Sequence, residues 1–330
     1  MATTISGDTG ASQVQDNTIT TADIQDSAVT ASKIQDSAVT APKVAGANGT
    51  SGQLLQSDGD GTMSWTDAAS GGSPTVETFT SGTAATWTKP ASANWIRIEV
   101  WGGGGSGGRA AGADAGGGGG GGGYLQLEVP FSYVSGSTIT YTVGSGAASA
   151  TSNGQDGLEG GTSSVTISDW RGGGSKTFYA YGGGGGQAST TQNALGGGGG
   201  SAFGTGLNGD IEGMGGSADA GYNNNAIIST TNQGSSTQNS TWQGGAGGRS
   251  SGTTDKTAGG GSVWAGGGGG AGGDSAPTNG GISYMGGNGG NGANNGTAAQ
   301  AGTQPAGGGG GSEQANSGAG ADGQVQFTTW

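Results

Sequence analysis

The chain has 330 residues, of which 85 are glycine and only 29% are hydrophobic, so a single copy has little material for a conventional core. Nine Lys and Arg against 22 Asp and Glu give a net charge of −13, which argues against binding to nucleic acid and against a polybasic contact with membranes. The absence of Cys and His excludes disulfides, thiolate metal sites and a histidine base. The close acidic pairs near the glycine-rich part, Asp156 with Glu159 and Asp210 with Glu212, are better explained as surface charge than as the two carboxylates of a glycosidase, so we expect no metal, no cofactor and no enzyme. No apolar stretch approaches the length of a membrane span, and no signal peptide is expected at the N-terminus.

Three related decads fill residues 15–44: QDNTITTADI, QDSAVTASKI and QDSAVTAPKV. Because a period of five residues fits neither a helix nor a strand, each decad must change conformation internally. A disordered linker is one interpretation; the other, which the strict register favours, is a stem in which three parallel chains enclose the apolar row. The predicted trimeric stem covers residues 1–48, and its core consists of Val14, Ile19, Ile24, Val29, Ile34, Val39 and Val44.

Residues 49–74 form the next predicted region, a hairpin neck followed by a short linker. Leu54 and Leu55 precede an Asp-Gly turn at 58–61, and Met63 and Trp65 follow it. Two short β-prone runs around Asp-Gly are typical of a hairpin. The two turn aspartates could suggest calcium, but no acidic residue downstream completes an EF-hand loop, so a simple turn is favoured.

From residue 75 the pattern changes to alternating apolar and polar residues, which predicts strands. The clearest is WIRIEVW, in which Ile96, Ile98 and Val100 alternate with charged residues. The C-terminal GQVQFTTW alternates in the same way and is predicted to return and pair with the first strands. The other predicted strands are 76–79, 85–88, 124–129, 138–143, 164–168 and 177–181.

Blocks of glycine interrupt this region at 102–108, 116–123, 182–186, 196–200, 244–248, 266–273, 286–292 and 307–311. The blocks lack the sustained triplets of collagen and the Gly-Lys-Ser/Thr of a phosphate-binding loop. Disorder is the compositional default. The alternative is a set of polyglycine-II helices, left-handed with three residues per turn, packed so closely that a side chain would not fit. Their frequent apolar and aromatic spacers favour the ordered alternative.

The spacers between the blocks are expected to form loops at the ends of this packing. Aromatic residues on a rigid scaffold suit contacts with sugars or proteins. Packing against the glycine segments is the competing explanation for each of them. The receptor-binding candidates are Phe203, Tyr222, Trp242, Trp264 and Tyr284.

The decads and the hairpin resemble stem segments of bacteriophage tail fibres. TWTKPASANWIRIEVWGGGGSGG at 86–108, GGGYLQLEVPFSYVSGSTITYTVGSG at 121–146 and the closing GADGQVQF resemble the glycine-rich domain at the tip of such fibres. The alternation of glycine motifs with variable spacers also resembles the polyglycine-II adhesins of T-even-like phages. Those adhesins are separate chains mounted on a fibre, whereas stem and tip share one chain here.

The resemblance implies a homotrimeric, receptor-binding tail fibre that is made in the host bacterial cytoplasm and becomes part of the virion. Its N-terminal end would join other tail proteins, and its tip, residues 75–330, would adsorb to a surface polysaccharide or an outer-membrane protein of the host. The expected fold is mainly β, with a trimeric stem followed by a glycine-rich, β-sandwich-like tip built on polyglycine-II helices. A purely structural or capsid-decorating fibre without a receptor stays open as the alternative.

Overall fold

A computed structural model describes residues 29–30, 34, 40, 49–59, 62–67, 73–91, 93–112, 114–134, 136–190, 193–206, 208–209, 243–251, 255–273 and 277–330. These belong to two compact units, Met1–Gly71 and Gly72–Trp330. Of the predicted stem core, Val29 and Ile34 are described, and both are exposed in the single chain. The other five residues of that row lie outside the described part, so the trimeric stem stays a prediction.

The predicted hairpin is confirmed in the first unit. Strands β1 (Gln53–Ser57) and β2 (Met63–Asp67) pair antiparallel with Leu55 opposite Trp65. Asp58 supports the turn, because its two carboxylate oxygens accept hydrogen bonds from the hydroxyls of Thr62 and Ser64 at 3.2 and 2.7 Å. This bonding gives the aspartate a structural role in the turn.

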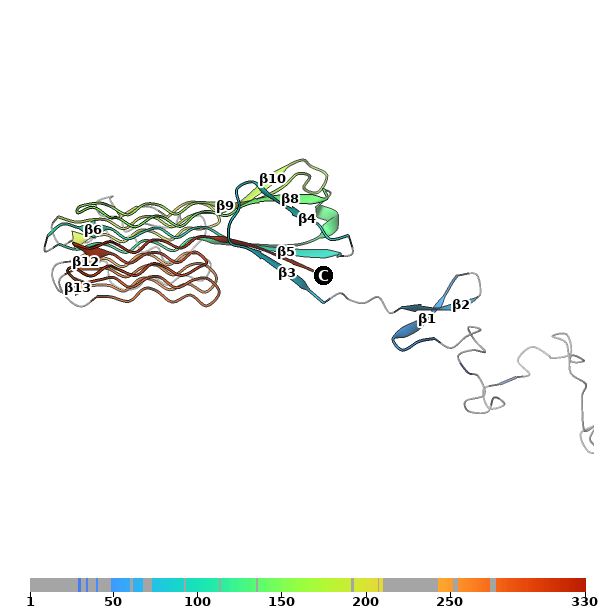
Figure 1. Cartoon of the computed structure of the whole chain (residues 1–330). Helices are drawn as coiled ribbons and strands as arrows, with labels where there is room; N and C mark the ends of the chain where they lie inside the picture. The colour runs from blue at the N-terminus through green and yellow to red at the C-terminus, as the bar shows by residue number, and fades with distance from the viewer. Residues whose placement is uncertain are drawn as a thin grey trace, which may run out of the picture. The chain divides into compact units, whose positions relative to one another are not determined.

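The second unit begins with two four-stranded antiparallel sheets (Figure 1). The first has the order β3 (Thr75–Phe79), β15 (Gln324–Thr329), β5 (Trp95–Trp101) and β7 (Tyr124–Pro130). The second has the order β10 (Lys176–Ala180), β9 (Ser163–Ile167), β8 (Thr138–Thr142) and β4 (Ala85–Thr88). All predicted strands are confirmed to within one residue at either end. The C-terminal strand does return, and it lies between β3 and β5.

The two sheets bury one hydrophobic core between them. Along β5, Ile96, Ile98 and Val100 point inward, as their alternation with charged residues predicts. From the C-terminal strand, the fully buried Phe327 stacks on Trp87 of the opposite sheet, with ring centroids 4.5 Å apart. These apolar contacts fix the faces on which the two sheets meet.

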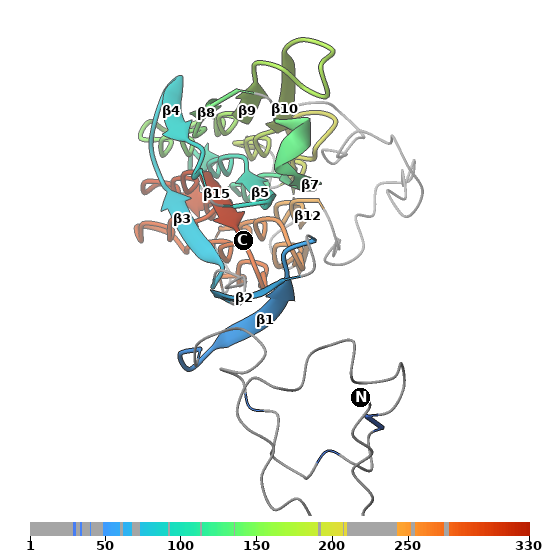
Figure 2. The same cartoon turned by 90° about the vertical axis from the view of Figure 1, so that its right-hand side faces the viewer.

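The glycine segments continue directly from the first sheet. Segment 102–108 leaves β5, turns at the two-residue strand β6 (Arg109–Ala110) and returns as segment 116–123 into β7. Every third residue bonds the two segments: the N–H groups of Gly102, Gly105 and Gly108 donate to the carbonyls of Gly123, Gly120 and Gly117. The segments lie one beside another and extend away from the sheets (Figure 1), and Figure 2 looks along them.

Segment 116–123 shows how the packing works. From Gly117 to Gly122, successive N–H groups bond to three different neighbouring segments in rotation. They donate in order to the carbonyls of Gln187, Gly248, Gly309, Gly184, Gly245 and Ala306. Its carbonyls accept from three further segments, 102–108, 195–200 and 266–272. The segment therefore has six bonded neighbours within one chain, and the backbone groups replace the side chains of an ordinary core.

Close approach of the backbones explains why these residues are glycine. A Cβ placed on Gly118 would overlap the carbonyl of Gly269, and one on Gly120 would overlap that of Gly198. Neither glycine has a φ in the left-handed region, so lack of space, and not backbone conformation, is the reason for the residue. The described glycine blocks thus form one packed structure, which we call the glycine array.

Segments at the margin of the array contain fewer glycines. In the stretch after β8, Gly144, Ala147 and Ala150 are buried whereas Ser145 and Ala148 are exposed, so burial recurs every third residue. Gly206 and Gln300 lie in spacers that were expected to form loops, but both also bond to array segments. These parts of the two spacers belong to the array, because only one residue in three needs to be small at the margin.

The remaining elements are short. A 3-10 turn, η3 (Phe131–Tyr133), follows β7. Two-residue strands at the margin of the array are β11 (Asn193–Ala194), β12 (Ser250–Ser251), β13 (Asp255–Lys256) and β14 (Ser312–Glu313), the last of which pairs in parallel with β6.

Candidate functional site

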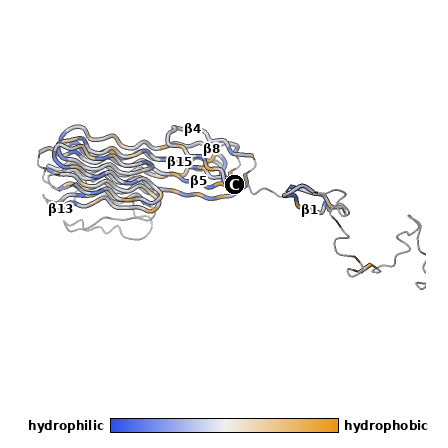
Figure 3. The backbone as a smooth tube through the Cα atoms, turned by 60° about the horizontal axis from the view of Figure 1, so that its bottom comes forward, coloured by the Kyte–Doolittle hydropathy of each residue, from blue (hydrophilic) through white to orange (hydrophobic). Residues whose placement is uncertain are grey.

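The array has two ends that differ in chemistry. At the sheet-side end, where the segments meet β5 and β7, the turns 201–204, 262–265, 282–285 and 303–306 connect neighbouring segments. At the far end, beyond Arg109 and Gly116, the loops 151–155, 294–297 and 314–317 contain only Ala, Gly, Ser, Thr, Asn and Gln. Hydrophilic colours gather at these far-end turns in Figure 3.

Three of the sheet-side turns are fixed by a serine at their first or second residue. The Oγ atoms of Ser201, Ser262 and Ser283 accept hydrogen bonds from the N–H groups three residues later, at 3.0, 3.1 and 2.8 Å. The hydroxyl of Ser262 also donates to the carbonyl of Gln243 at 2.8 Å, and that of Ser283 donates to the carbonyl of Ala265 in the turn 262–265 at 2.6 Å. Because the hydroxyls of Ser262 and Ser283 each make both bonds, their turns hold the neighbouring side chains in fixed positions.

Two predicted receptor-binding residues lie on these turns and face solvent. Phe203 is 72% exposed and Tyr284 is 82% exposed. Beside Tyr284, Ile282 and Met285 are also exposed, so the turn at 282–285 presents three large apolar side chains. Exposed apolar residues grouped on a rigid turn are typical of a contact surface.

Trp264 has a different environment. Its ring stacks on Tyr124, with centroids 5.7 Å apart and planes 16° from parallel, and its carbonyl accepts a 2.8 Å hydrogen bond from the indole of Trp101. Trp264 thus packs the array against the first sheet, which is the competing explanation for the aromatic spacers. Tyr222 and Trp242 lie outside the described residues.

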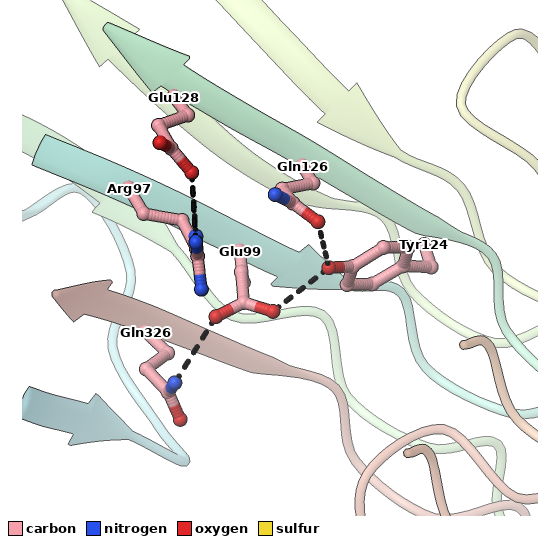
Figure 4. Close-up of polar contacts among 6 residues, drawn as sticks. All are labelled: Arg97, Glu99, Tyr124, Gln126, Glu128 and Gln326. Atoms are coloured by element: carbon pink, nitrogen blue, oxygen red, sulfur yellow. Dashed lines mark hydrogen bonds and ion pairs between the residues drawn. The ribbon is translucent and has the colours of Figure 1, made fainter. Parts of the chain in front are cut away.

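A polar cluster covers the outer face of the first sheet (Figure 4). The buried carboxylate of Glu99 accepts hydrogen bonds from the hydroxyl of Tyr124 at 2.8 Å and from the amide of Gln326 at 3.2 Å, and nearby Arg97 pairs with Glu128 at 2.8 Å. Burial, followed by the bond to Glu99, raises the pKa of Tyr124 above its usual value. The tyrosine therefore stays protonated, and the cluster ties β5, β7 and β15 together.

Sequence reasoning missed the role of Arg109 at the far end. Its Nε donates to Oδ1 of Asn153 at 3.0 Å, one Nη donates to Oδ1 of Asn316 at 2.9 Å and to the carbonyl of Thr151, and the other donates to the carbonyl of Gln314 at 3.1 Å. One side chain therefore holds two far-end loops on β6. The one signal in the sequence for this structural role is that basic residues are rare, with nine Lys and Arg in the chain.

Acidic side chains lie beside the glycine segments in the part of the chain that the structure describes. No group of three His, Cys, Asp or Glu side chains there is arranged to hold a metal ion. The carboxylate of Asp156, beside the glycine segments, accepts a 2.6 Å hydrogen bond from the N–H of Ala188. That contact gives the carboxylate a structural use.

Among the described residues, no helix has the length and hydropathy needed to cross a membrane. No curated protein matches the chain. A family described as a glycine-rich domain matches residues 78–330, a range that includes the whole described array and nearly all of the two sheets. The chain therefore belongs to this glycine-rich domain family.

Proposed function

We propose that the protein is a bacteriophage tail fibre whose glycine-rich domain is a rigid receptor-binding tip. The family assignment supports the glycine-rich part, and the resemblance of the stem decads and hairpin to tail fibres supports the rest. The protein would be made in the cytoplasm of a host bacterium and carried in the virion. Its partners would be tail proteins at the N-terminal end and a polysaccharide or outer-membrane protein on the host.

In this proposal the glycine segments are polyglycine-II helices beside a β-sandwich. Such a helix has three residues per turn and no hydrogen bonds of its own, so each N–H must reach a neighbour. The rotation of the donors Gly117, Gly118 and Gly119 among three segments, repeated over the next three residues, is what this geometry requires. Six neighbours around one segment agree with hexagonal packing of rods.

The exposed aromatic turns carry the adhesive part of the proposal. Serine-anchored turns hold Phe203 and Tyr284 on a scaffold whose backbone groups are bonded to one another, so little entropy is lost on binding. Aromatic faces stack on sugar rings and pack on protein side chains alike. The net charge of −13 disfavours long-range attraction to an anionic envelope, so the contact would depend on these short-range interactions.

Binding of the labelled full-length chain to a panel of bacterial strains tests this function. Replacing both Phe203 and Tyr284 with Ala is expected to lower cell binding at least about tenfold, since each aromatic contact contributes on the order of 1 kcal/mol or more. Tyr179→Ala, at a less exposed aromatic residue on β10, is the matched control and should bind as the wild type does.

The outcomes separate the rival explanations. Full binding by the double variant would show that Phe203 and Tyr284 do not bind the receptor, and the far-end loops would then become the candidate binding site. Failure of the wild-type chain to bind any strain would reject receptor binding and favour the purely structural or capsid-decorating fibre.

A further inference from the structure

The outermost glycine segments face a problem like that of an edge strand in a sheet. With N–H groups pointing in three directions in rotation, a segment at the margin directs every third N–H away from the array. Such a row of free donors is a template on which the backbone of a second molecule can add. A chain with several such margins should join other copies through its glycine segments unless the donors are occupied.

Asparagines occupy the donors at one margin. Segment 286–292 carries Asn288 and Asn291, three residues apart, in the sequence GGNGGNG. Oδ1 of Asn291 accepts the N–H of Gly280 at 2.8 Å, and Oδ1 of Asn288 accepts the N–H of Ser283, also at 2.8 Å. For Gly280 the side-chain oxygen takes the position that the carbonyl of a further glycine segment would hold, whereas for Ser283 it bonds the turn at 282–285.

Side-chain oxygens also accept hydrogen bonds from backbone N–H groups at other margins of the array. Oδ1 of Asn208 accepts the N–H of Gly185 at 2.7 Å. Oδ1 of Asp322 accepts a hydrogen bond from the N–H of Gly146 at 2.7 Å, and Oδ1 of Asp156 accepts one from the N–H of Ala188. The two aspartates also place negative charge at the margin of an acidic chain, where a second copy would meet like charge.

We propose that these Asn and Asp side chains terminate the glycine array, so that it is complete within one chain and does not extend into a second copy. The surface they occupy would otherwise accept a glycine segment of another molecule. Copies of the protein can then assemble through other parts, such as the proposed stem, while their glycine arrays do not bind to one another. The inference depends on the packed array and is independent of receptor binding.

The test is the double substitution Asn288→Gly with Asn291→Gly in the full-length chain. Glycine keeps the backbone of the segment and removes both acceptors, so the N–H of Gly280 loses its partner. We expect association beyond the stoichiometry of the wild type, increasing with concentration in light scattering, and amide exchange at Gly280 faster by about fivefold or more, as loss of one hydrogen bond predicts. Asn295→Gly, in the exposed turn at 294–297, is the matched control and should do neither.

Asp322→Gly provides a second variant at a different margin, read out at Gly146. Faster exchange at Gly280 and Gly146 with an unchanged particle mass would overturn the proposal, because the side chains would then merely satisfy backbone groups. Crosslinking of wild-type tips through segment 278–281 would overturn it as well.

Discussion

At the scale of single residues, the array requires glycine for reasons of volume. Gly118 lies in the segment with six bonded neighbours, and a methyl group there would overlap the carbonyl of Gly269. Backbone atoms cannot move aside as the end of a flexible side chain can. The local separation of two segments must therefore increase, which weakens the hydrogen bonds between them.

We expect Gly118→Ala to destabilise the second unit by about 1–3 kcal/mol, the usual cost of overpacking a core. Gly173→Ala is the control, because the nearest atom to its added Cβ is the carbonyl of Trp170 at 3.3 Å and its φ is not left-handed. The free energy of unfolding of this control should stay within about 1 kcal/mol of the wild-type value. Thermal unfolding measures both, and equal unfolding temperatures for Gly118→Ala and the wild type would contradict the volume argument.

Residue type alone could not identify the functional side chains. Phe203 and Trp264 occupy similar Ser-x-aromatic turns in the sequence, yet one is exposed and the other stacks on Tyr124. The difference arises from the neighbour that the topology supplies, since β7 brings Tyr124 beneath Trp264 only. Arg109 was missed for the same reason, because its bonding partners are up to 207 residues away in sequence.

At the scale of elements, several strands of the two sheets could be predicted because they carry a local alternation that one buried face requires. The runs WIRIEVW and GQVQFTTW are the clearest cases. Marginal segments of the array could not be predicted, since Gly144, Ala147 and Ala150 form a period of three that is weak against the high Ala and Ser background. The sequence also cannot show which segments bond to one another, because runs of identical glycines do not distinguish one pairing or register from another.

The outer face of the first sheet leads to a prediction about alkaline pH. The pKa of Tyr124 is raised from its ordinary 10.0, first by burial and then by the hydrogen bond and charge of Glu99. In the unfolded chain this tyrosine loses its proton near pH 10, whereas in the folded chain it keeps it. The unfolded state therefore binds fewer protons above that pH, and the free energy of unfolding falls as pH rises.

Tyr124→Phe should remove this dependence. Above pH 10 the free energy of unfolding of the variant should fall less steeply than that of the wild type, by at most about 1.4 kcal/mol per pH unit. Below pH 9 the variant should be less stable than the wild type by about 1–3 kcal/mol, because Glu99 loses a donor while buried. Tyr179→Phe, which removes an exposed hydroxyl, is the control. Denaturant unfolding across pH 8–11 gives both quantities, and parallel curves for wild type and Tyr124→Phe would refute the assignment.

At the scale of the whole molecule, the N–H and C=O groups of the central segment 116–123 are bonded within one chain, so we expect the glycine array to fold without a second copy. The proposed trimer must then depend on the stem. Val29 and Ile34 are 58% and 41% exposed in the single chain, which leaves apolar surface available for other copies to cover. The two parts should accordingly respond to mutation independently.

Replacing both Val29 and Ile34 with Asp is expected to dissociate the trimer, because each charge would have to be buried without a partner at a cost of several kcal/mol. The tip should keep its protected amides, since the bonds of segment 116–123 stay within one chain. Light scattering gives the mass of the particle, and hydrogen exchange gives the state of the array. Ser37→Asp, at a polar position of the same decad repeat, should leave the trimer intact. A double variant that stays trimeric would refute the stem, whereas one that loses amide protection as it dissociates would show that the tip depends on the other copies after all.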